Sequence, residues 1–269
     1  MNALKLLLPA SLLAWTTPVL AKDAVPAEEQ TTEALARAAQ NPIADIYSFP
    51  FQDNIGLNYG PNRGVQNVLN FQPVIPIHAG PVNVITRTIV PIVTQPSLVP
   101  GDTGATTGLS NINFSAFVSP AEPGPIIWGI GPIVSFPTAT SPLLGSQSTW
   151  GLGPSAVVLT MQGPWVLGVL VNNVWSVAGD TSNNFLLQYF INYNFPGGWF
   201  LTSAPIITAN WNAASGNQWL VPFGAGFGKL QRFGKLPINL SAQAYWNAFH
   251  PSTLPYAPWI IRLSVTVLL

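Results

Sequence analysis

Hydrophobic and polar residues alternate with a period of two along most of the chain from residue 49 onward. From Trp259 to Leu269 every second residue is apolar, whereas Arg262, Ser264 and Thr266 occupy positions of the opposite parity. Successive side chains of a β-strand point to opposite faces, so this pattern predicts strands with one apolar and one polar face. No apolar run reaches the roughly 18 residues that indicate a membrane helix.

Twelve segments of this kind predict twelve strands. They cover residues 49–59, 65–77, 82–93, 108–118, 125–136, 149–160, 164–177, 184–195, 198–211, 218–228, 236–248 and 258–269. Most are longer than soluble strands, whose usual length is about five to six residues, and they are long enough for tilted membrane strands. Their polar face carries Asn, Gln, Ser and Thr in place of Lys and Glu, as a barrel lumen does. The prediction is an all-β, transmembrane, antiparallel up-and-down β-barrel with a short N-terminal helix; a soluble sandwich is the alternative.

The connections between these segments support a membrane barrel. Alternate connections form a mostly short set (78–81, 119–124, 161–163, 196–197, 229–235) and a longer set (94–107, 137–148, 178–183, 212–217, 249–257). Bacterial barrels have short periplasmic turns and longer external loops. Eight tryptophans lie near strand ends with the apolar parity, as expected at membrane interfaces: Trp128, Trp150, Trp165, Trp175, Trp199, Trp211, Trp219 and Trp259.

The first 48 residues differ from the rest. Residues 1–21 combine Lys5, an apolar core and a small-residue ending at Ala21, which predicts a signal peptide cleaved near Ala21 and export from the cytoplasm. Residues 22–48 form a charged leader in which 33–39 predict a short helix that ends at Asn41-Pro42. The predicted barrel covers residues 49–269, and the leader is a candidate plug of its lumen.

Composition narrows the function. Only 7% of the residues are charged, and the net charge is zero. A nucleic-acid-binding protein would need a basic surface, so we expect no nucleic-acid partner. The chain has no cysteine and two histidines, which excludes thiolate chemistry and argues against a metal site or other cofactor. Because His78 and His250 fall in predicted connections and neither lies mid-strand beside both a serine and an acid, we expect no enzyme activity.

Prolines are the one feature that conflicts with a regular barrel. Pro73, Pro76, Pro91, Pro205 and Pro222 fall inside predicted strands, where proline removes a hydrogen-bond donor. One interpretation is a set of β-bulges. The other is a local gap in the wall through which apolar solutes leave sideways into lipid.

Six stretches together resemble a bacterial family of outer-membrane transporters. They are 66–76, 86–91, 163–168, 171–176, 203–211 and 190–199, the last reading Phe-Ile-Asn-Tyr-Asn-Phe-Pro-Gly-Gly-Trp. Many members of this family carry the misleading label "neuromedin U", and the family is similar to the MetA-pathway phenol-degradation barrels. The resemblance, from about residue 41 onward, implies an outer-membrane barrel with a transport role. Barrels of this kind end in an aromatic residue, whereas this sequence ends in Leu269, so less efficient insertion is expected.

Polar residues on the inward parity are the candidate solute path. We expect these residues to line the lumen: Asn83, Arg87, Gln188, Asn192, Asn194, Asn239, Gln243, Tyr245 and Arg262. An unpaired guanidinium inside a barrel needs water or an acid. One hypothesis is that Glu29 or Glu33 of the leader reaches Arg87 or Arg262; the other is that both arginines are solvated.

The sequence therefore predicts a channel or transporter in the bacterial outer membrane for small, apolar or weakly polar solutes. The alternative is a non-conducting structural or adhesive barrel that acts through its external loops. The expected partners are the lipid bilayer, lipopolysaccharide, the barrel assembly machinery and a small-molecule solute. The expected state is a monomer or a small homo-oligomer.

Overall fold

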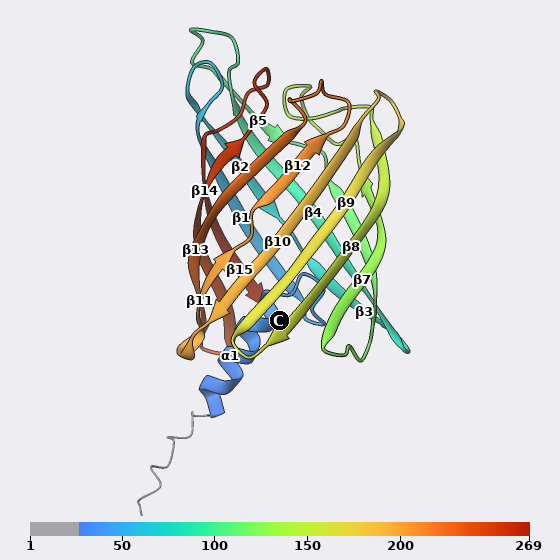
Figure 1. Ribbon diagram of the computed structural model, residues 1–269, viewed down its shortest axis with the longest axis vertical. Coiled ribbons are helices and arrows are strands. Elements are labelled where there is room, and N and C mark those ends of the chain that lie inside the picture. Colours follow the sequence, from blue (N-terminus) through green and yellow to red (C-terminus); the bar gives the residue numbers. More distant parts are fainter. Residues whose placement is uncertain (1–26) are drawn as a thin grey trace, which may run out of the picture.

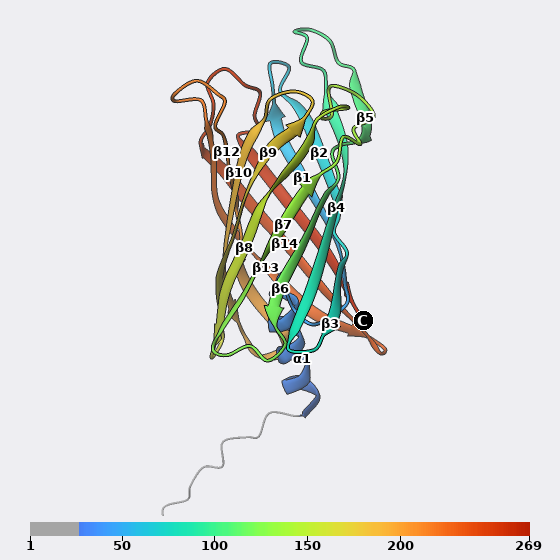
Figure 2. The same ribbon diagram turned by 90° about the vertical axis from the view of Figure 1, so that its right-hand side faces the viewer.

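Fifteen strands of the described chain form one antiparallel sheet that closes on itself as a barrel (Figures 1 and 2). The structure is a computed structural model that describes residues 27–269, with side-chain detail from Thr32 onward. The predicted signal peptide, residues 1–21, lies outside the described residues. The elements are α1 (Ala27–Ala39), β1 (Ser48–Tyr59), β2 (Gly64–Phe71), β3 (Val74–Ala79), β4 (Val82–Pro96), β5 (Ala105–Leu109), β6 (Asn113–Pro120), β7 (Ile126–Ser135), β8 (Trp150–Gln162), β9 (Trp165–Ala178), β10 (Asn183–Asn194), η1 (Pro196–Gly198), β11 (Trp199–Ser203), β12 (Ile206–Asn210), β13 (Trp219–Phe233), β14 (Leu236–Phe249) and β15 (Trp259–Leu268).

These fifteen strands make twelve wall strands, because three wall strands are interrupted. β2 and β3 keep one register against β4, and β11 and β12 keep one register against β10. β5 and β6 both pair with β4. The first and last strands pair without interruption, from Ser48 opposite Leu268 to Leu57 opposite Trp259. The predicted all-β fold, a twelve-stranded antiparallel barrel with one short N-terminal helix, is confirmed.

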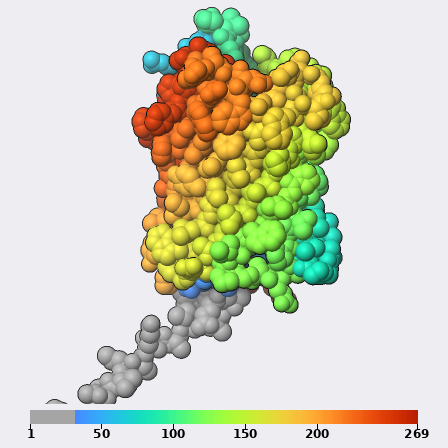
Figure 3. Space-filling view, turned by 45° about the vertical axis from the view of Figure 1, so that its right-hand side comes forward, coloured from blue at the N-terminus to red at the C-terminus, as the bar shows by residue number. Residues whose placement is uncertain are grey.

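Alternation along the strands sorts side chains between the wall's outer face and the lumen. The eight tryptophans of the predicted girdles are all exposed, at 38–48% of their surface. Trp128, Trp165 and Trp199 lie where strands leave the short turns, and the other five lie toward the long loops. Figure 3 shows one side of this outer wall as a continuous layer of side chains. An apolar band between two aromatic girdles is the surface that a bilayer solvates.

One carboxylate interrupts the apolar band. Asp53 shares the parity of the exposed Phe51 and lies opposite Leu263, which is also exposed. Its Oδ1 accepts a hydrogen bond of 2.6 Å from Asn67 Nδ2 on the neighbouring strand β2. Asp53 and Asn67 thus lie on the outward face of the wall, where we expected apolar residues.

The short connections lie at the end of the barrel where the C-terminus and α1 are found (Figure 1). One of them corrects a predicted boundary: residues 229–235 were expected to form a turn, but β13 continues to Phe233. The alternation also continues, since Leu230 is buried and Phe233 is exposed. Lys229 lies 5.0 Å from the centre of the Trp199 ring, so the charge lies at the girdle within a strand. Gly234, with a φ of 63°, allows a tight turn instead.

Helix α1 docks against the same end of the barrel (Figure 2). It extends further toward the N-terminus than the predicted 33–39 and ends at Ala39, before Pro42. Ala36 is completely buried against Leu230 and Leu268. Of the helices in residues 27–269, none is long and apolar enough to cross a membrane.

The five strand prolines have different consequences. Pro76 and Pro91 stay within strands, opposite Ile85 and Asn70. Pro222 follows a register shift in β13, as the bulge interpretation predicts. Pro73 and Pro205 instead coincide with the interruptions between β2 and β3 and between β11 and β12. At the interruption between β11 and β12, the backbone pairing with the neighbouring strand β13 is missing, as described below.

Candidate functional site in the barrel lumen

Three cavities follow one another along the lumen. The vestibule, at the end with the long loops, has a volume of about 510 Å³. The central cavity has about 90 Å³ and the lower cavity about 180 Å³. Ile89, Ile133, Asn172 and Leu186 line both the vestibule and the central cavity. Neighbouring cavities therefore share walls, and we call the central cavity, which has the smallest volume of the three, the constriction.

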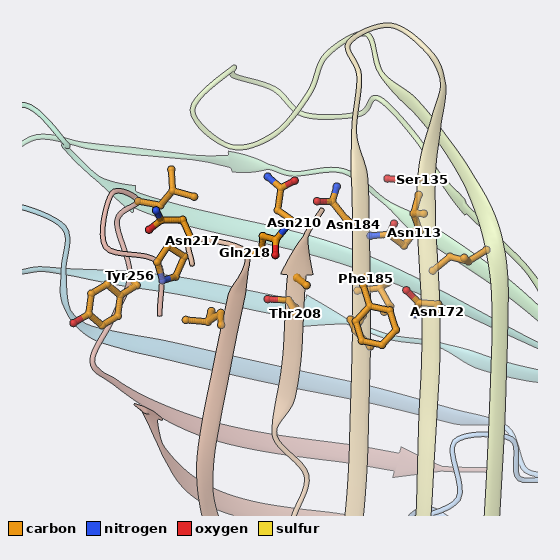
Figure 4. Close-up of a pocket in the computed structure, with 18 of the residues that line it drawn as sticks. Asn113, Ser135, Asn172, Asn184, Phe185, Thr208, Asn210, Asn217, Gln218 and Tyr256 are labelled. Atoms are coloured by element: carbon orange, nitrogen blue, oxygen red, sulfur yellow. The ribbon is translucent and has the colours of Figure 1, made fainter. Parts of the chain in front are cut away.

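The vestibule combines amides with an apolar wall and contains no charged side chain among its lining residues. Figure 4 shows its polar groups on strands and loops around one space. The lining amides are Asn113, Asn172, Asn184, Asn210, Asn217 and Gln218. Each amide can donate and accept hydrogen bonds. The vestibule therefore suits a neutral solute that has an apolar body and a few polar atoms.

A loop between β14 and β15 closes part of the vestibule. Asn217 Oδ1 accepts hydrogen bonds from the backbone N–H of Ser252 at 2.7 Å and from its hydroxyl at 2.9 Å. His250 stacks on Tyr256 with ring centres 3.7 Å apart. These contacts hold Tyr256, a lining residue of the vestibule, over the entrance.

Arg87 lies at the constriction, because it lines both the central and the lower cavity. Its guanidinium donates a short hydrogen bond to the side-chain oxygen of Gln72. Ser115 lies opposite Arg87 on β6 and lines the central cavity with it. The Arg87 side chain thus faces the lumen.

The side chain of Arg262 also points inward, but its hydrogen bonds go to residues of the barrel wall. Its Nε donates to Asn54 Oδ1 at 2.8 Å, and its Nη1 donates to the carbonyl oxygen of Ala204 at 2.7 Å. The guanidinium lies 4.8 Å from the centre of the Tyr245 ring. Tyr245 in turn donates to Gln243 and accepts a hydrogen bond of 3.1 Å from the Ala204 N–H. Two side chains therefore bind the peptide groups of Ala204.

The ladder beside Ala204 is open. β11 pairs with β13 up to Thr202 opposite Gly226, and pairing resumes at Thr208 opposite Leu220. Residues 203–207 therefore have no ladder partner on β13, and Pro205 lies in this stretch. A side-chain contact, from Ser203 Oγ to the Gly224 carbonyl at 2.7 Å, bridges the seam. We call residues 203–207 and the facing residues 221–225 the open seam.

The leader closes the lower cavity. Ala39, Gln40 and Pro42 line that cavity together with strand residues. Gln40 and Asn194 exchange amide hydrogen bonds of 2.8 and 3.2 Å. Ile43 is buried in the apolar cluster that contains Ile85 and Phe117. The leader thus enters the barrel through amide and apolar contacts.

The expected acid–arginine contacts are not formed by the described side chains. The ion pair found in this part of the chain joins Asp45 to His78, at 2.9 Å, on the exposed rim. The hydrogen bonds of Arg87 and Arg262 go to amides and a carbonyl, and Glu33 contacts neither arginine. The side chain of Glu29 lies outside the described residues.

The remaining expected lumen residues divide by place. Gln188, Asn192, Asn239 and Gln243 line the lower cavity. Asn83 is buried nearer the short turns and lines none of the three cavities. Sequence reasoning missed Gln72, Ser115, Asn172 and Gln40. The inward parity of their strands could have indicated the first three, whereas nothing in the leader's sequence marks Gln40.

Neither histidine of the described residues is paired with a serine. His78 has an acid partner, Asp45, and His250 contacts a carbonyl oxygen and Tyr256, but neither hydrogen-bonds to a serine in residues 27–269. No group of three His, Asp or Glu residues that could hold a metal ion occurs there.

In the loop between β4 and β5, the backbone N–H of Gly104 and the hydroxyl of Ser97 hold the pKa of the Asp102 carboxyl below its usual value.

Comparison with solved structures finds a similar fold in an outer membrane protein. The crystal structure of an outer membrane channel from Pseudomonas putida F1 superimposes with a TM-score of 0.62 over 83% of this chain and 94% of that one, at 14% identity. The likeness is one of fold. The outer membrane phospholipase dimer of Salmonella typhi, with bound calcium, gives a TM-score of 0.42 at 13% identity over 88% of this chain and 97% of that one.

No family model matches this chain, and no curated protein does. The resemblance to the outer-membrane transporter family therefore stays a prediction from the six quoted stretches.

Proposed function

We propose that this protein is a channel or transporter of the bacterial outer membrane for small, apolar or weakly polar solutes. The observation that carries the proposal is the row of three lumen cavities lined by amide and apolar side chains. A path for inorganic ions would carry rings of charged side chains. The two aromatic girdles support a membrane location, and the P. putida channel shares the fold.

The proposal also covers how the protein reaches the outer membrane and which molecules surround it there. Residues 1–21 direct export and are removed near Ala21, and the assembly machinery inserts residues 49–269 as the barrel. The outer face then contacts lipid and lipopolysaccharide. The chain is a member of the transporter family that its six stretches resemble, and it carries out no catalysis.

The solute leaves the lumen sideways through the open seam. The vestibule lies above this seam, since Thr208 and Leu220, the first pair above it, both line the vestibule. Below the constriction, the leader blocks a straight exit through Gln40 and Ile43. An apolar solute that has entered the vestibule would therefore pass more easily into lipid than through the lower cavity.

Single-channel conductance of the refolded mature protein in a planar bilayer tests the proposal, with and without residues 22–45. We expect small, steady conductance from the complete mature protein and larger conductance after deletion, because the lower cavity loses its cap. Heat-modifiable migration on gels shows that both forms are folded barrels. Silence in both folded forms, together with no uptake of apolar solutes, would contradict the proposal and favour a non-conducting barrel that acts through its loops.

A further inference from the structure

The two arginines inside the barrel have different surroundings. Arg262 uses two donor atoms on Asn54 and Ala204, stacks on Tyr245 and lines none of the three lumen cavities. Arg87 has one side-chain partner, Gln72, and lines two of them. Arg262 is therefore committed to the wall, whereas Arg87 presents donors to a space that a solute can enter.

The central cavity beside Arg87 has a mixed lining. Its polar lining residues are Gln52, Asn70, Gln72, Ser115, Ser155, Asn172 and Gln188, and its apolar ones are Ile89, Phe117, Ile133, Leu170, Leu186 and Ile206. Because this cavity has only about 90 Å³, a molecule whose polar end reaches Arg87 places part of its apolar body in the adjoining vestibule or lower cavity.

Among residues 32–269, no carboxylate lines either cavity that Arg87 enters. A guanidinium has five N–H donors in a planar fork that matches a carboxylate, and Gln72 occupies a small part of that capacity. Burying a cation without an opposite charge is costly, and an incoming anion removes much of that cost. Among the described side chains, Arg87 is thus a positive group that borders the cavities without a counter-charge, which an anionic solute would supply.

We propose that Arg87 is the anchor of a binding site for small carboxylates with an aromatic or short aliphatic body. The inference rests on the proposed transport function and adds small organic anions to its solutes. The carboxylate binds the Arg87 fork beside Gln72, and the body lies against Phe117, Ile133 and Leu186, the last two of which also line the vestibule.

The test compares two probes of nearly equal shape, 4-fluorobenzoate and 4-fluorobenzamide, by ¹⁹F NMR titration. The complete mature protein is studied in zwitterionic lipid nanodiscs at pH 7, with empty nanodiscs subtracted. We expect the carboxylate to bind at least tenfold more tightly than the amide. Arg87→Gln should lower carboxylate affinity at least tenfold and leave amide affinity within twofold. Arg63→Gln, which makes the same charge change at an exposed turn outside the lumen, should change neither.

Equal affinity of the two probes for the wild-type protein would overturn the site without any variant. So would unchanged carboxylate affinity in folded Arg87→Gln protein. If Arg87→Gln does not fold, Arg87→Lys keeps the charge but loses the fork, and its carboxylate preference must fall below that of the wild type. Conductance and solute flux test the transport proposal separately. Carboxylate binding without conductance or flux would support the Arg87 site and contradict the transport function. Flux without a carboxylate preference that depends on Arg87 would support the transport function and contradict the site.

Discussion

At the scale of single residues, inward side chains replace the hydrogen bonds that a proline removes. Pro205 interrupts the wall, and the peptide of Ala204 binds Tyr245 and Arg262 instead of a neighbouring strand. Buried peptide groups require such partners, since leaving one unpaired costs about 1–3 kcal/mol. Arg262 is therefore a structural residue in a position where a lumen charge was expected to face solutes.

We predict that Arg262→Gln destabilises the folded barrel by about 1–3 kcal/mol, because Asn54 and the Ala204 carbonyl lose a charged donor. Urea unfolding and refolding in lipid vesicles, followed by tryptophan fluorescence, measures the change. Arg63→Gln removes an exposed arginine and serves as the control, with an expected change below about 0.5 kcal/mol. Equal stability of both variants would show that the open seam holds without Arg262.

Close approach between strands also depends on single residues. A Cβ on Gly131 would lie 1.7 Å from the carbonyl oxygen of Ala116, so Gly131→Ala must displace β6 from β7. We predict a loss of at least about 3 kcal/mol or failure to fold, measured as the heat-modifiable fraction after refolding. At Gly124 a Cβ meets nothing within 4 Å and the backbone needs no positive φ, so Gly124→Ala should refold like the wild type. Normal refolding of Gly131→Ala would refute the prediction.

At the scale of elements, the local pattern predicted the twelve wall strands well. Parity is a local property, and the exposure of Trp128 and Trp259 follows from it. The partners of Ala204 could not be predicted in this way, because they lie 41 and 58 residues away in the sequence. The leader shows the same limit: its charges suggested contacts with the lumen arginines, whereas Ala36, Gln40 and Ile43 dock it and Asp45 pairs with His78 at the rim.

Helix α1 offers a test of the plug. Ala36 is completely buried against β13 and β15, and Ala34 is exposed on the same helix. We predict that Ala36→Glu releases the helix, because a carboxylate does not fit against Leu230 and Leu268, and that single-channel conductance increases. Ala34→Glu introduces the same residue at an exposed position and should leave the conductance unchanged. Equal conductance in the two folded variants would mean that α1 does not restrict the lumen.

At the scale of the whole molecule, the seam between β11–β12 and β13 has a long gap in its pairing. Residues 203–207 and 221–225 face each other without a ladder, whereas the gap between β6 and β7 covers only residues 116–117 and 131–132. Phe223 and Ala225 are exposed on the outer face beside this gap. The proposed sideways route places the exit of apolar solutes there.

A disulfide across the seam tests the sideways route, and the chain has no native cysteine to interfere. The register from Thr202 opposite Gly226 places Ser203 opposite Ala225. We predict that Ser203→Cys with Ala225→Cys, once oxidised, reduces apolar solute uptake at least fivefold and leaves ion conductance unchanged, and that reduction restores uptake. The control bridge, Leu240→Cys with Val265→Cys, joins strands that are already paired and should have no effect. Unchanged uptake through the oxidised seam would exclude the sideways route.

The complete pairing of β1 with β15 has a consequence for how this barrel is made and used. A closed sheet is finished when its first and last strands meet, and here that junction is regular from Ser48–Leu268 to Leu57–Trp259. The junction that completes the sheet is thus distinct from the junction with the five-residue gap, which lies between β11–β12 and β13. Opening the gap between residues 203–207 and 221–225 would therefore leave the pairing of the first and last strands untouched.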